Sequence, residues 1–101
     1  LPISSEAAFF GGDIARVPYM TPGSDELAEA VSTIMMDEWA VFMVNHGVVC
    51  AGRSLRKACD TIQIIERTAE VILGCFAVGK EPTLLPQSAI DKFRAIGDII
   101  A

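Results

Sequence analysis

Positive charge is scarce in this sequence. Its 8 Lys and Arg residues are outnumbered by 13 Asp and Glu residues, giving a formal net charge of −5. The basic residues do not gather into a stripe. Nucleic-acid-binding proteins usually carry such a basic surface to neutralise phosphates. We therefore expect no nucleic-acid partner.

A long apolar run is also missing. Residues 39–51 are the longest charge-free apolar stretch, and they contain Asn45, His46 and two prospective turns. A membrane-spanning helix needs roughly 20 apolar residues, so we expect no membrane partner. The first residues, Leu1-Pro2-Ile3, include neither Met nor the basic and apolar regions of a signal peptide. We interpret this start as an internal point of a longer chain.

A cysteine pattern typical of disulfide bonds is absent as well. The three cysteines, Cys50, Cys59 and Cys75, are odd in number and lack a CxxC spacing. They lie in apolar sequence surroundings, which favours reduced core thiols over a disulfide framework or a metal site. This usage is typical of a cytoplasmic protein.

Apolar residues, in contrast, are plentiful. They make up 51% of the 101 residues, whereas charged residues make up 21%. The length allows one small domain, and no repeat or linker divides it, so we assign residues 1–101 to a single domain. A chain this short cannot easily bury so much apolar surface alone. We expect part of it to be buried against something outside this sequence.

The spacing of apolar residues predicts four helices. A short helix over 4–10 is stopped by Gly11-Gly12, and the extended segment 13–17 follows it. The next helix begins after Ser24, whose hydroxyl can cap it. Ser54 can cap a long helix that ends at Gly79, and a last helix starts at Pro86 and ends near Gly97. The long helix has an apolar stripe with helical spacing, which we expect to be buried: Leu55, Cys59, Ile62, Ile65, Ala69, Ile72, Leu73 and Phe76.

Two apolar, β-prone segments flank the sequence Asn45-His46-Gly47. Residues 40–44 and 48–51 predict two strands joined by a tight connection. Because these strands lack polar alternation, we expect a sheet covered on both faces. The coarse architecture is an α/β unit with three or four helices around part of a sheet.

His46 is the only histidine and the main candidate for chemistry. At a strand end its backbone is fixed while its side chain is free, and Gly47 leaves room for a bound group. Neutral imidazole is a common metal ligand, and Asn45 could orient it through a hydrogen bond. The alternative is an ordinary turn histidine bonded to a carbonyl group. A catalytic zinc needs about three protein ligands, and one histidine cannot supply them.

The segment 39–55 resembles the class II aldolase/adducin family. It has that family's order of apolar strand, Asn-His-Gly, apolar strand, Gly, polar residue and Ser-Leu, followed by a long helix. Val17-Pro18-Tyr19 upstream, and Ile65-Glu66 with Ala69 downstream, fit the same order. The resemblance covers nearly the whole chain and identifies it as the C-terminal half of such a protein.

The resemblance implies a fold and an activity. The fold is a three-layer α/β/α sandwich with a mainly antiparallel sheet, of which this chain is an incomplete part. Family enzymes include fuculose- and rhamnulose-phosphate aldolases, ribulose-phosphate epimerases and decarboxylases. They hold a divalent metal, usually zinc, through three histidines, and His46 matches the third. The metal stabilises an enediolate made from a small sugar phosphate or related hydroxy-carbonyl compound. A cytoplasmic homotetramer is implied, and the 101 residues alone are expected to be inactive.

Two departures from the fuculose aldolases bear on the reaction. By this resemblance, the first of their two tyrosine slots holds Glu6 here and the second falls near Ile96. Glu6 is therefore a candidate acid/base group for a neighbouring subunit's site, or else a solvated carboxylate in a first helical turn. The alternative from another class is a non-catalytic, adducin-like assembly domain without metal. The Asn-His-Gly setting of His46 favours the enzyme.

Overall fold

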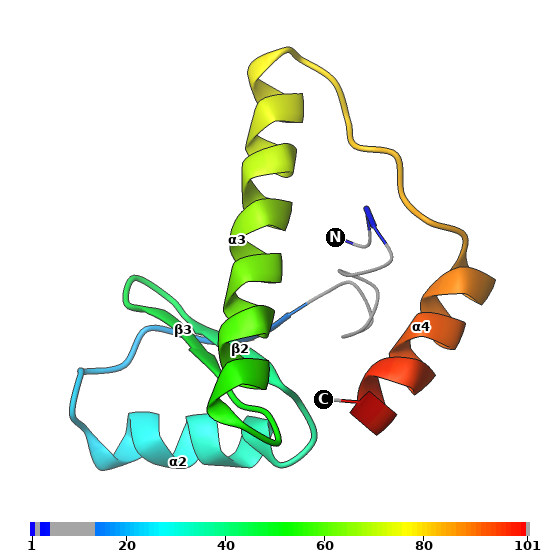
Figure 1. Ribbon diagram of the computed structural model, residues 1–101. Helices are drawn as coiled ribbons and strands as arrows, with labels where there is room; N and C mark the ends of the chain where they lie inside the picture. Colours follow the sequence, from blue (N-terminus) through cyan, green and yellow to red (C-terminus); the bar gives the residue numbers. More distant parts are fainter. Residues whose placement is uncertain (2, 5–13, 101) are drawn as a thin grey trace. The chain divides into compact units, whose positions relative to one another are not determined.

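The computed structural model describes residues 1, 3, 4 and 14–100, with side chains described as far as residue 96. Most of the short helix predicted over 4–10 lies outside this range. The chain forms two compact units, Ile14–Thr61 and a second one that contains the described residues from Ile62 onward, and each is described by itself. The elements, drawn in Figure 1, are β1 (Ala15–Val17), α2 (Asp25–Met35), β2 (Ala40–Met43), β3 (Gly47–Cys50), α3 (Leu55–Ala77) and α4 (Gln87–Ile100).

A small mixed sheet of order β1-β2-β3 is the centre of the first unit. β1 runs parallel to β2, with Ala15 opposite Val41. β2 and β3 form the predicted antiparallel hairpin, with Val41 opposite Val49. The parallel pair requires a crossover connection, and α2 supplies it.

The predicted helix after Ser24 is confirmed as α2. The Ser24 hydroxyl accepts a hydrogen bond of 3.1 Å from the Leu27 amide. Asp25 and Glu26 occupy the first turn, where their charge is favourable at the positive end of the helix dipole. Sequence alone therefore determines where this helix begins.

The core of the unit lies between α2 and one face of the sheet. Val41 is completely buried, Val17 is 1% exposed, and Leu27 of α2 packs with them. Alternate residues point to the other face, where Phe42 and Val48 are only half-buried. The described part of this unit thus covers one face fully and the other partly, whereas we expected cover on both.

α3 begins and ends as predicted. The Ser54 hydroxyl accepts a hydrogen bond of 3.2 Å from the Lys57 amide at its start. At its end Gly79 has a φ of +73°, and the Lys80 amide bonds the Cys75 carbonyl oxygen at 2.9 Å. This is a Schellman cap, and glycine adopts its left-handed conformation at no steric cost.

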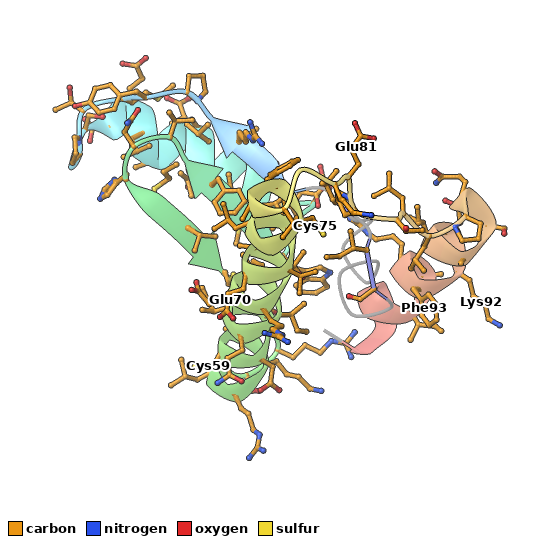
Figure 2. All side chains as sticks on the ribbon, turned by 90° about the horizontal axis from the view of Figure 1, so that it is seen from above. Cys59, Glu70, Cys75, Glu81, Lys92 and Phe93 are labelled. Carbon is orange, nitrogen blue, oxygen red and sulfur yellow. The ribbon has the colours of Figure 1, made fainter. Side chains whose placement is uncertain are left out.

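The expected burial of the α3 stripe is wrong for most of its members. Only Ile65 is buried, while Leu55, Leu73 and Phe76 are 83%, 67% and 60% exposed. Cys59, near the start of the helix in Figure 2, is exposed rather than a core thiol. The other two cysteines are half-buried, and all three are free.

α4 continues through Gly97 to Ile100 instead of ending near the glycine. A glycine inside a helix costs only about 1 kcal/mol, which is too little to force an end. The Pro86 carbonyl accepts bonds from Ala89 and Ile90, so the proline precedes the first turn. No helix among the described residues is long and apolar enough to cross a membrane.

Candidate functional site

His46 lies in the turn that joins β2 to β3. Its backbone amide donates a hydrogen bond of 2.9 Å to the Met43 carbonyl oxygen, and Met43 pairs with Gly47 across the hairpin. Residues 44–46 therefore form a three-residue connection whose path is set by the strand ladder. The position of His46 at the end of a strand, as predicted, is confirmed.

Asn45 gives this turn its shape. It has a φ of +62°, the only positive φ of a non-glycine residue in the described part of the chain. It is the third residue of the turn Met43–His46, the position at which type II turns require positive φ and select Gly or Asn. The sequence suggested a hydrogen-bonding role for Asn45 and gave no account of this backbone requirement.

Gly47 also has a conformational reason to be glycine. Its φ of +155° is rarely adopted by other residues, and a Cβ placed there would have no atom within 4 Å. The space beside the His46 backbone is therefore open. Val44, the first residue of the three-residue connection, is fixed by a bond of 3.1 Å from its amide to the Val17 carbonyl oxygen of β1.

The His46 side chain is exposed to solvent. No hydrogen bond to its imidazole is found among the described side chains and backbone groups, so the alternative of a histidine held by a carbonyl group is not observed there. An exposed imidazole on a backbone fixed by three strands can donate a nitrogen lone pair to a metal. The chemistry of His46 therefore fits a divalent metal, which is the group that the family resemblance implies.

The rest of a metal shell is not formed by the described residues. Within them, no group of three His, Cys, Asp or Glu side chains could hold a metal ion. Glu6, the candidate acid/base residue, lies outside the described residues, and its role stays a prediction.

Two other regions of the described surface do not extend the site around His46. The basic residues after the hairpin, Arg53, Arg56 and Lys57, are exposed. An open hollow of about 420 Å³ lies between the start of α2 and Met43, and His46 is not among its lining residues. The Ser24 hydroxyl that lines it accepts the Leu27 amide bond that caps the helix.

Known proteins are similar to this chain in sequence and in fold. The model of the family described as "Class II Aldolase and Adducin N-terminal domain" matches residues 1–73. A 5-deoxy-D-ribulose 1-phosphate aldolase of Bacillus thuringiensis is 31% identical over 99 residues, which cover 94% of this chain and 46% of that protein. A 3-oxo-tetronate 4-phosphate decarboxylase of Escherichia coli is 34% identical over 71 residues, covering 70% of this chain and 32% of that protein.

A solved structure agrees with these relatives. YgbL from Klebsiella pneumoniae, assigned to the aldolases, epimerases or decarboxylases, superposes with a TM-score of 0.79 at 32% identity. The superposition covers 92% of this chain and 44% of YgbL.

The chain belongs to the class II aldolase and adducin family. The predicted fold class is confirmed: the described elements form part of the α/β fold of this superfamily. The chain spans less than half the length of the relatives it matches.

Proposed function

We propose that this chain is part of a metal-dependent enzyme that cleaves, forms or rearranges a small sugar phosphate or a related hydroxy-carbonyl compound. The observation that carries the proposal is the exposed His46 imidazole on a turn fixed by the sheet, in a chain related to sugar-phosphate aldolases and decarboxylases. The relatives support the family's type of chemistry, and the turn supports the role of His46.

In this proposal His46 is one ligand of a divalent metal, Zn²⁺ by preference. A neutral imidazole binds zinc without cancelling its charge. Bound there, the cation would act as a Lewis acid and stabilise the negative oxygens of an enediolate. Because one imidazole does not make a zinc site, the other ligands come from outside the described residues.

The backbone of the turn orients the ligand. The bond from the His46 amide to Met43 and that from the Val44 amide to Val17 fix both ends of the connection. The open space beside Gly47 leaves room for a substrate near the imidazole. Preorganisation of this kind avoids an ordering cost when the metal binds.

We further propose that Glu6 acts as an acid/base group and that the active enzyme is a cytoplasmic homotetramer. A glutamate that transfers a proton without binding the metal should affect turnover alone. We therefore expect Glu6→Gln to lower kcat at least tenfold and to leave metal content unchanged. Unchanged kcat would remove Glu6 from the catalytic groups.

Metal analysis of the whole protein tests the central proposal. We expect the purified protein to contain a stoichiometric divalent metal and His46→Ala to lose most of it, together with activity. Val44→Ala, a change of an exposed side chain in the same turn, is the matched control and should keep the metal. Equal metal content in the His46→Ala protein would exclude His46 from the site.

A further inference from the structure

β1, an edge strand of the described sheet, ends at a proline. Val17 is its last residue, and Pro18 follows with no amide hydrogen to donate. A proline restricts the residue before it to extended conformations, because the ring would otherwise collide with that residue's backbone. The direction of the Val17 carbonyl group is therefore limited by the amino acid that follows it.

The Val17 carbonyl oxygen accepts the hydrogen bond that holds the hairpin turn. Its partner is the Val44 amide at 3.1 Å, and Val44 is the first of the three residues in the connection that carries His46. The other end of the connection is held by the bond of 2.9 Å from the His46 amide to the Met43 carbonyl oxygen. This second bond stays within the hairpin, so the bond from Val44 is the one that ties the turn to β1.

Core packing holds Val17 as well. Its side chain is 1% exposed and packs with Val41 and Leu27 between the sheet and α2. Packing fixes the side chain of Val17, whereas the proline limits the rotation that aims its carbonyl group. β1 has only three residues, so few ladder bonds of its own contribute to this aim. The proline is therefore the local feature that prepares the acceptor for Val44.

We propose that Pro18 is a positioning residue for His46, acting through the hydrogen bond that ties the turn to β1. In the closed turn this bond is made, and the His46 backbone has one position. In the open turn it is broken, and Val17 rotates within the limits that the proline leaves. By narrowing those limits the proline lowers the entropy of the open turn and favours the closed one. The inference rests on the proposed role of His46 as a metal ligand.

Metal binding and closure of the turn are coupled in this proposal. A ligand that is ordered beforehand loses less conformational entropy when it binds a cation. The apparent affinity of the protein for a metal then scales with the fraction of molecules whose turn is closed. In return, a metal that binds only the closed turn raises that fraction, since coupling between two events is reciprocal. Pro18 thus strengthens metal binding without contributing a ligand atom.

Amide hydrogen exchange measures closure of the turn directly. NMR of the whole protein follows the Val44 amide, which is protected while its bond to Val17 is made. Without metal, we expect Pro18→Ala to speed this exchange about threefold, the usual effect of releasing one proline constraint. Pro18→Gly should speed it further, because glycine adds conformational freedom of its own.

Pro22→Ala is the matched control. Pro22 is also exposed, lies in the same compact unit, and belongs to a turn closed by the 3.1 Å bond from the Ser24 amide to the Thr21 carbonyl oxygen. Its replacement releases a comparable constraint, but in the described structure this turn has no hydrogen bond to residues 44–46. We expect the two alanine variants to lose similar free energy of unfolding in urea, and Pro22→Ala to leave Val44 exchange unchanged.

Zn²⁺ supplies the second half of the test. We expect saturating Zn²⁺ to slow Val44 exchange by about tenfold or more in the unaltered protein and to have no such effect in His46→Ala. The Kd for Zn²⁺, measured against a competing chelator, should rise from the unaltered protein to Pro18→Ala and again to Pro18→Gly, by about twofold in all. Pro22→Ala should keep the original Kd.

Two results would overturn the inference and leave the metal proposal intact. One is Val44 exchange that Pro18→Ala leaves unchanged or that Pro22→Ala speeds equally. The other is Zn²⁺ binding that depends on His46 while Val44 exchange stays as fast as without metal. Unchanged Zn²⁺ binding in His46→Ala would instead overturn the proposed function, and the positioning role with it.

Discussion

The amide of Val44 donates a hydrogen bond of 3.1 Å to the carbonyl oxygen of Val17. This bond joins the first residue of the hairpin turn to β1, a strand distant in sequence. The turn that carries His46 is consequently fixed by three strands instead of two. A ligand on such a turn keeps its position without help from its own side-chain hydrogen bonds.

The positive φ of Asn45 leads to a prediction about stability. Asn45→Gly should leave the free energy of unfolding within about 0.5 kcal/mol of the original, because glycine adopts this conformation freely. Asn45→Ala should destabilise the protein by about 1 kcal/mol, because alanine lacks the short polar side chain whose local hydrogen bonds make the left-handed region accessible to asparagine. Urea denaturation measures both. If Asn45→Gly lowered the free energy of unfolding as much as Asn45→Ala, the hydrogen bonds of the Asn45 side chain would matter more than the backbone conformation of this residue.

The complete burial of Val41 leads to a second prediction. Val41→Ala removes two methyl groups from the contact between the sheet and α2 and leaves a cavity. We expect a loss of about 2 kcal/mol in the free energy of unfolding. The same change at Val44, which is 40% exposed, should cost less than about 0.5 kcal/mol. Similar losses at both positions would contradict the location of the core.

The cysteines differ in reactivity. Burial raises the pKa of the Cys50 thiol above its ordinary value of 9.0, whereas Cys59 is exposed. The thiolate is the reactive form, so iodoacetamide should modify Cys59 of the isolated chain first and Cys50 only at higher pH. Mass spectrometry of digests taken over time identifies the order, and faster modification of Cys50 would contradict it.

The same shift predicts a pH effect on folding. The unfolded state ionises Cys50 first as the pH rises above 9.0, so the free energy of unfolding should fall in that range. Cys50→Ser removes the ionisable thiol and is the appropriate control. A fall of the same size in the serine variant would assign the effect to other groups.

Local signals in the sequence were enough for much of the secondary structure. Ser24 and Ser54 correctly placed the starts of α2 and α3, and Gly79 the end of α3, because caps satisfy backbone groups within a few residues. The predicted end of α4 near Gly97 was wrong, because a glycine near a helix end acts as a cap only where its backbone adopts the left-handed conformation. The Asn-His-Gly sequence located the hairpin and the candidate ligand for a similarly local reason.

The sequence by itself determined α2, α3, the start of α4, the hairpin, the family resemblance and the choice of His46. Only the tertiary structure decided that β1 lies parallel to β2, that Val17 holds the turn, and that Asn45 adopts a positive φ. It also decided which side of α3 is buried. Helical spacing shows that residues share a face, but which face is buried depends on the partners that segments distant in sequence bring to it.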